Sequence, residues 1–107
     1  MPQLLDNPHP GEILKEEFLD ELGLSQNALA EAIGVPSNRI NAIVRGRRGI
    51  TADTDLRLCR FFDLSEGYWL RLQNAYDLME ARRESLRHIE RIQPYAAGQG
   101  HVAGAGR

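Results

Sequence analysis

Apolar residues recur at helical spacing through residues 10–93, and no stretch alternates between apolar and polar residues as a half-buried strand would. Gly23, Gly34 and Gly46 each follow a short apolar-periodic segment, where a helix commonly ends in a left-handed conformation. A chain of 107 residues has room for one compact domain. The pattern therefore predicts an all-α domain of five helices.

Residues suited to helix N-termini precede the apolar segments. Pro10 fits the first turn of the first helix, and Ser25 and Thr51 are candidate N-caps of the second and fourth. The fifth helix is expected to start near residue 65 and to continue, whole or broken, to residue 93. The residues expected to face inward are Ile13, Leu14, Phe18, Leu19 and Leu22 in the first helix, Leu29, Ala30 and Ile33 in the second, Ile40, Ile43 and Val44 in the third, and Leu56, Cys59 and Phe62 in the fourth.

Composition divides the chain into four parts. Residues 1–9 form an N-terminal arm, residues 10–79 form the helical domain, and residues 80–93 form a charged helical extension. Residues 94–107 are rich in glycine and alanine, so we expect them to be a flexible tail.

Several classes of protein are excluded by simple features. The chain contains no run of about 18 apolar residues that would span a membrane. Its N-terminus lacks the basic start and apolar stretch of a secretion signal. Cys59 is the one cysteine and cannot form an internal disulfide, which fits a reducing compartment. We therefore expect a cytoplasmic protein that has no contact with a membrane.

Charge is distributed unevenly, although the net charge is only -2. Residues 1–36 carry seven acids and one base, whereas residues 37–52 carry four arginines and no acid. The basic block is either an anion-binding surface or a solvated segment. The acidic residues within 12–21 are likewise either a solvated helix face or a patch that attracts a basic partner.

Residues 24–46 read LSQNALAEAIGVPSNRINAIVRG and predict two short helices that cross sharply at Gly34. Ala30, four positions earlier, is small enough for the helices to approach closely. In a helix-turn-helix, the second helix lies in the major groove of DNA and its N-terminal residues reach base edges. Asparagine can pair with adenine and arginine with guanine. The residues expected to point outward are Ser37, Asn38, Asn41 and Arg45, with Arg39 on a flank.

This segment resembles the Xre-type, lambda-repressor-like helix-turn-helix family. Three further blocks, HPGEILKEEFL from residue 9, GITADT from residue 49 and YWLRLQNAYDL from residue 68, are similar to those of its HigA antitoxin branch. The resemblance runs from about Asn7 to Met79. It implies a five-helix lambda-repressor-like domain.

The resemblance also implies a function and its partners. Such a protein is a dimeric antitoxin that neutralises a HigB/RelE-like, mRNA-cleaving toxin and represses its own operon by binding double-stranded operator DNA. In relatives, the position of Gln26 contacts a DNA phosphate, and the positions of Ser37, Asn38 and Asn41 face bases. A two-fold dimer is expected to place its recognition helices about 34 Å apart. The segments 69–76 and 89–92 are our candidates for the dimer surface.

Each candidate DNA contact has an alternative interpretation. Arg45, Arg47 and Arg48 are expected to touch phosphates, because a loop after the recognition helix tends to follow the DNA backbone, but they are otherwise solvated. Arg39 either contacts DNA or pairs with an acid of the neighbouring helix. Asn38 and Asn41 are either base contacts or ordinary exposed helix residues. Trp69 and Tyr76 are aromatics of the core or of the dimer interface.

Two other functions compete with the antitoxin. A stand-alone Xre-type transcriptional regulator without a toxin partner would share every DNA-facing residue. An enzyme has little support, because the sequence has no paired carboxylates, catalytic triad or phosphate-binding glycine loop at a usable spacing. His9, His88 and His101 are scattered, so no metal site and no cofactor are expected.

Overall fold

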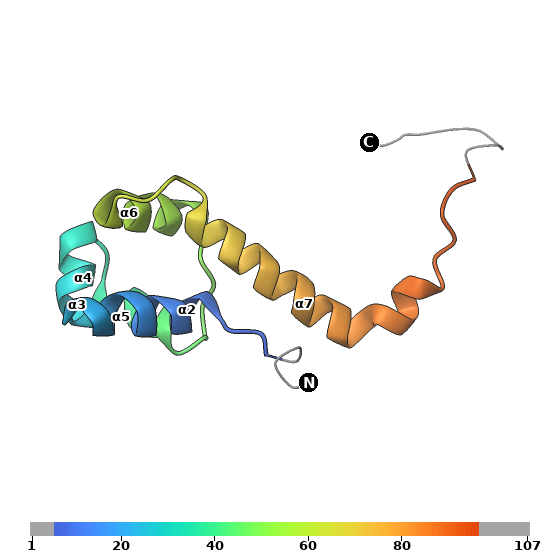
Figure 1. Cartoon of the computed structure of the whole chain (residues 1–107), viewed down its shortest axis with the longest axis horizontal. Helices are drawn as coiled ribbons and strands as arrows, with labels where there is room; N and C mark the ends of the chain where they lie inside the picture. The colour runs from blue at the N-terminus through green and yellow to red at the C-terminus, as the bar shows by residue number, and fades with distance from the viewer. Residues whose placement is uncertain (1–5, 97–107) are drawn as a thin grey trace.

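The computed structural model describes residues 6–96, and this part of the chain is helical without a strand. The first helix is continuous over three segments, α2 (Pro10–Ile13), the π-helical η1 (Leu14–Leu19) and α3 (Asp20–Leu22). It is followed by α4 (Gln26–Ile33), α5 (Ser37–Val44), α6 (Ala52–Phe62) and α7 (Tyr68–Glu90). The first four helices form a compact body from which α7 projects (Figure 1). The predicted all-α domain of five helices is therefore confirmed.

The helices begin and end largely as their sequences predict. Pro10 is the first residue of α2, and Ser25 Oγ accepts a hydrogen bond from Ala28 N at 3.0 Å at the start of α4. Thr51 caps α6 in the same way. Gly34 ends α4 with φ 74°, a conformation in which a side chain would be strained, so the chain can turn at once into α5.

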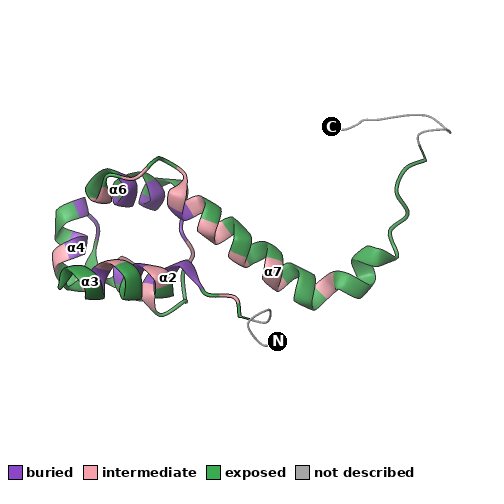
Figure 2. Cartoon of the chain, in the orientation of Figure 1, coloured by how far each residue is buried: buried purple, intermediate pink, exposed green. Residues whose placement is uncertain are grey.

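The core lies where the helices of the body face one another and the start of α7. Buried residues gather on these inward faces (Figure 2). Phe18 connects the first helix to α6 and α7. The centroid of its ring lies 4.8 Å from that of Phe62 and 5.0 Å from that of Trp69. Cys59 is buried among them, as predicted, and burial raises the pKa of its thiol. The wholly buried large apolar residues are Leu14, Leu29, Ile40, Ile43, Leu58 and Trp69.

Two residues predicted to face inward do not. Leu22 is 63% exposed, because the π-helical segment before it has wider turns and shifts the face that the end of the first helix presents to the core. Leu56 is 47% exposed, while Leu58 is fully buried. In α6 the inward face follows Asp55, Leu58, Cys59 and Phe62, so a buried carboxylate takes the place that an apolar residue was expected to occupy.

Asp55 explains how α7 begins. Its Oδ2 accepts a hydrogen bond from Gly67 N at 2.7 Å, and its Oδ1 accepts bonds from Trp69 N at 2.8 Å and Leu70 N at 3.1 Å. Gly67, the residue before α7, has no side chain to do this. The first N–H groups of α7 are therefore capped by a carboxylate from α6, which ties the two helices together.

The aromatic residues of the C-terminal part divide between core and surface. Trp69 is fully buried, so of the two places that the sequence left open for it, the core and the dimer interface, the structure has the core. Tyr76 is half-buried and its ring packs edge-on against that of His9 at 4.9 Å between centroids. Of the adjacent pair Phe61 and Phe62, the first is exposed and the second packs on the core.

The division into arm, domain, extension and tail can be compared with the structure in three respects. In the arm, His9 is buried and Asn7 Nδ2 donates to Tyr76 O and to Glu80 Oε2, both at 3.0 Å. The boundary placed between residues 79 and 80 lies inside α7, which continues unbroken to Glu90. The predicted tail falls outside the described residues except for 94–96, which are exposed.

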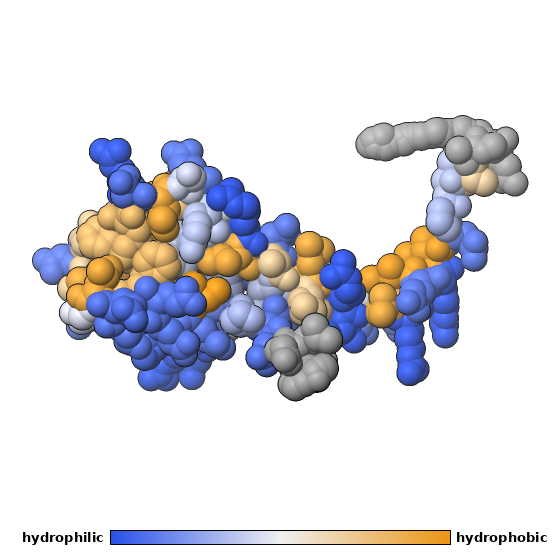
Figure 3. All heavy atoms as spheres, in the orientation of Figure 1, coloured by the Kyte–Doolittle hydropathy of each residue, from blue (hydrophilic) through white to orange (hydrophobic). Residues whose placement is uncertain are grey.

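The middle and distal parts of α7, together with Ile92 just after its end, carry apolar side chains that are largely exposed within residues 6–96. Leu78, Leu86, Ile89 and Ile92 are 44–68% exposed. Figure 3 shows apolar surface along the part of α7 that extends away from the body. No helix of the described part is long and apolar enough to cross a membrane.

Candidate nucleic-acid interface

The helices α4 and α5 cross through a tight turn that the sequence makes possible. Val35 N donates to Ala30 O at 3.0 Å, which closes the end of α4 directly onto the turn. Ala30 is buried between the helices, and Ile40 and Ile43 hold the inner face of α5 against the core. The outer face of α5 is therefore free to meet a ligand.

Three of the predicted base-contacting residues share this outer face. Ser37, Asn38 and Asn41 are all exposed and stand at positions 1, 2 and 5 of α5. Ser37 and Asn38 lie in the first turn, which is the part of a recognition helix that reaches base edges. Their side chains offer both donors and acceptors, as the edges of bases require.

Gln26 and Asn41 are brought together although fifteen positions separate them. Asn41 Nδ2 donates to Gln26 Oε1 at 3.3 Å across the junction of α4 and α5. Gln26 is the first residue of α4, so its amide stands at the edge of the polar face of α5. The bond leaves Gln26 Nε2 as a donor and Asn41 Oδ1 as an acceptor for an external partner.

The loop arginines extend the polar face beyond α5. Arg45, Arg47 and Arg48 are exposed, and none of the three has an ion pair within residues 6–96. The backbone beneath them is well defined, because Arg47 N donates to Ala42 O at 2.8 Å. Three unpaired guanidinium groups on an ordered turn form a surface suited to phosphate.

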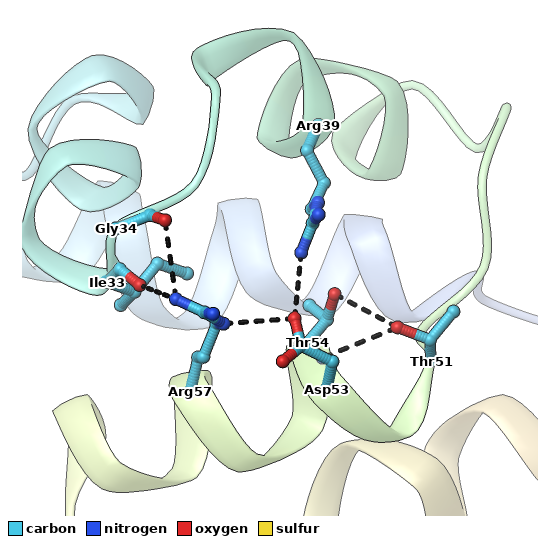
Figure 4. A network of polar contacts seen from close by, with 7 residues as sticks. All are labelled: Ile33, Gly34, Arg39, Thr51, Asp53, Thr54 and Arg57. Atoms are coloured by element: carbon cyan, nitrogen blue, oxygen red, sulfur yellow. Dashed lines mark hydrogen bonds and ion pairs between the residues drawn. The ribbon is translucent and has the colours of Figure 1, made fainter.

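Arg39 is placed differently from the other predicted DNA contacts. Its Nη1 donates to Asp53 Oδ2 at 3.0 Å, and its side chain is only 23% exposed (Figure 4). The sequence left open a pair with an acid of a neighbouring helix, and this is the arrangement that the structure has. The hydrogen bond from Arg39, followed by the one from Arg57, holds the pKa of Asp53 below its ordinary value, so the carboxylate stays charged.

Residues that sequence reasoning missed support α5 from behind. A Cβ on Gly11 would come 1.8 Å from Ile43 O, so the first helix meets the backbone of α5 at a point where only glycine fits. His9 Nδ1 accepts a hydrogen bond from Gly11 N at 2.9 Å. Gln73 Oε1 accepts one from Ile50 N at 2.7 Å and holds the loop after α5 against α7. Of these contacts, only that of Gly11 had a local signal in the sequence, since glycine is unusual in the first turn of a helix.

This geometry defines a helix-turn-helix domain whose second helix has an exposed polar face, which the basic loop after that helix extends. Within residues 6–96 no group of three His, Cys, Asp or Glu side chains comes together as a metal site would require.

Comparison with known proteins agrees with this class. The model of the helix-turn-helix family matches residues 14–69. Virulence-associated protein I of Dichelobacter nodosus is 57% identical over 71% of this chain and 70% of its own length, and antitoxin HigA-1 of Vibrio cholerae is 33% identical over 78% and 79%. The structure of Pseudomonas aeruginosa antitoxin HigA with the higBA promoter aligns with a TM-score of 0.81 and 43% identity, over 85% of this chain and 100% of that one. The chain therefore belongs to the helix-turn-helix family, in the branch of the HigA-type antitoxins.

Proposed function

We propose that this protein is the antitoxin of a type II toxin–antitoxin pair, which binds its own operator through α5 and neutralises an mRNA-cleaving toxin of the HigB/RelE kind. The observation that carries the DNA half is the exposed face of Ser37, Asn38 and Asn41, held by a buried inner face and followed by three unpaired arginines. The similarity to a HigA antitoxin seen with its promoter supports the same assignment. The chain acts in the cytoplasm, as a binding protein and not as an enzyme.

The geometry of this face supports a role for each of its residues. Asn38 and Asn41 read base edges in the major groove, because both side chains are exposed on the outer face of α5 and Asn41 keeps its Oδ1 as an acceptor beside Gln26. Gln26 orients Asn41 and donates to a phosphate at the edge of the groove. Arg45, Arg47 and Arg48 follow the DNA backbone and supply affinity that does not depend on sequence.

Binding to two kinds of duplex tests these roles. The probes are the DNA upstream of the coding sequence and a random duplex of equal length, both at several salt concentrations. Asn41→Ala is expected to cost about 1–3 kcal/mol on the upstream duplex and little on the random one. Arg47→Ala is expected to weaken both equally and to lower the salt slope by about one. Equal losses on both duplexes for Asn41→Ala would refute the base contact, and an unaltered protein without any preference would refute operator binding.

The toxin half rests on charge. Glu12, Glu16, Glu17, Asp20 and Glu21 are all exposed along the first helix, and only Asp20 has an ion-pair partner there, Lys15 Nζ at 3.0 Å. This acidic face is complementary to a basic RNA-cleaving toxin. It lies on a different helix from the recognition face, so DNA and toxin need not compete for the same side chains.

Co-purification with the product of an adjacent short reading frame separates the antitoxin from a stand-alone regulator. A stable complex that restores growth to cells poisoned by that product supports the antitoxin. Glu16→Lys with Glu17→Lys is expected to weaken the complex, while Glu31→Lys with Glu66→Lys, at two exposed acids elsewhere on the body, is the control with the same change in charge. The absence of any complex would leave a transcriptional regulator with the same fold.

A further inference from the structure

Asp53 connects the recognition helix to the rest of the helix-turn-helix through one oxygen atom. Its Oδ2 accepts hydrogen bonds from Arg39 Nη1 and from Arg57 Nε, both at 3.0 Å. Arg39 comes from α5, while Asp53 and Arg57 stand one turn apart on α6. The carboxylate therefore receives one guanidinium from the recognition helix and one from its own helix.

Arg57 extends this connection to the end of α4. Its Nη1 donates to Ile33 O at 2.7 Å and to Gly34 O at 3.3 Å, the carbonyl groups that α4 leaves unpaired at its C-terminus. Figure 4 shows the chain of contacts running from the turn through Arg57 and Asp53 to Arg39. α4, the turn and α5 are thus all held against α6 by a single network.

Arg39 depends on Asp53 for its position. The Nε of Arg39 is buried without a hydrogen-bond partner, so the bond to Asp53 is the contact that compensates for placing this guanidinium between helices. If the carboxylate were absent, the partly buried guanidinium would lose its ion-pair partner and the side chain would turn toward solvent. That movement would add a positive charge near the DNA and release the flank of α5.

We propose that Asp53 is a positioning residue for sequence recognition, which holds Arg39 away from the DNA backbone and keeps α5 in register with the turn. This inference rests on the proposed reading of DNA by α5. It assigns Arg39 to the support of the recognition helix and leaves contact with DNA to the exposed residues.

Removal of the Asp53 charge has different effects on DNA affinity under two explanations of its role. If Asp53 only repels DNA, Asp53→Asn strengthens binding to every duplex equally, because a negative charge near phosphates is lost. If Asp53 positions α5, the variant binds random DNA more tightly but the upstream duplex less tightly. The ratio of the two affinities is then expected to fall about tenfold, the scale of one base contact. An unchanged ratio overturns the proposal.

Matched variants complete the experiment with the full-length protein. Asp53→Glu keeps the carboxylate and is expected to restore most of the ratio. Glu66→Gln removes the same charge from an exposed acid that has no ion pair within the described residues, and it is expected to leave the ratio unchanged. Thermal unfolding followed by circular dichroism confirms that each variant is folded. A ratio that falls equally for Glu66→Gln overturns the specific role of Asp53.

A double-mutant cycle shows whether Asp53 acts through Arg39. The combination of Asp53→Ala with Arg39→Ala is expected to lose no more specificity than Arg39→Ala alone, since Asp53 reaches α5 through its bond from Arg39. Arg39→Ala is also expected to leave the salt slope unchanged, unlike Arg47→Ala. Additive losses, or a slope lowered by about one in Arg39→Ala, contradict the proposal. Failure of the unaltered protein to prefer the upstream duplex contradicts the proposed function itself, so the two failures are distinguishable.

Discussion

Asp55 is the buried side chain on which the junction of α6 and α7 depends most. It is 2% exposed, and its two oxygens accept three hydrogen bonds from the backbone at the start of α7. Hydrogen bonds to a charged group contribute more than neutral ones, and a buried N–H without a partner carries its full desolvation cost. The capping carboxylate is therefore a larger contribution to stability than any exposed ion pair of the body.

We expect Asp55→Ala to lower the free energy of unfolding by about 3–5 kcal/mol, a large share of the stability of a small domain. Asp55→Asn keeps one acceptor oxygen and is expected to cost about half as much. Urea unfolding measures both, with Glu66→Gln, a change at an exposed acid between α6 and α7, as the control. A loss below about 1 kcal/mol in the alanine variant would contradict this role.

His9 makes stability depend on pH. Its Nδ1 caps the first helix as an acceptor, which requires the neutral ring. Burial lowers the pKa of His9, and this effect outweighs the opposing influence of Glu12 and Asp77. In the unfolded chain the ring takes up a proton more readily, with a pKa near 6.5. The contribution of His9 is therefore complete above that pH and is lost as the pH falls below it.

His9→Asn tests this directly, because asparagine is a good N-cap that does not titrate in this range. The variant is expected to show a smaller loss of stability than the unaltered protein between pH 7 and about pH 5, as measured by urea unfolding at each pH. His88→Gln, a change at an exposed histidine of α7, shows the effect of removing a histidine elsewhere in the chain. Identical profiles for all three proteins would show that His9 does not titrate within the folding equilibrium.

At the scale of the elements, the sequence correctly predicted the helix ends, because these are set by hydrogen bonds between residues close together in the chain. Ser25, Thr51 and Gly34 mark helix ends whose partners lie three to five residues away, so their spacing alone locates α4, α5 and the start of α6. The exposed polar face of α5 could be predicted for the same reason, since Asn38 and Asn41 stand opposite an apolar inner face of the same short helix.

The features that the sequence did not predict depend on partners far along the chain. Asp55 is a buried cap because its acceptors meet N–H groups twelve to fifteen residues later, and no spacing rule marks such a pair. Leu56 was assigned to the core from the spacing of apolar residues, whereas the helix turns Asp55 and Leu58 inward. For Arg39, charge alone allowed a DNA contact or an ion pair, and the choice required the position of α6 relative to α5.

At the scale of the whole molecule, the described chain is more elongated than a compact domain of the same length. Its radius of gyration is 18.2 Å and its longest extent is 58 Å, whereas a compact domain of this length has a radius near 13 Å. The excess comes from α7, which extends from the body (Figure 1). A lone projecting helix with exposed leucine and isoleucine gains stability when a second helix covers that face. This supports the expected homodimer, with distal α7 as its surface.

We expect Leu86→Asp with Ile89→Asp to convert a dimer into a monomer, because the change places two charges where apolar side chains would meet. The two recognition helices of a dimer bind one operator together, so the monomer is expected to lose on the order of a hundredfold in affinity for the upstream duplex. Sedimentation equilibrium gives the mass, and a titration of the same DNA gives the affinity. Leu56→Asp, a similar change at an exposed leucine of the body, should alter neither. An unaltered protein that sediments as a monomer at micromolar concentration, or a double variant that remains dimeric, would place the dimer surface elsewhere than on distal α7.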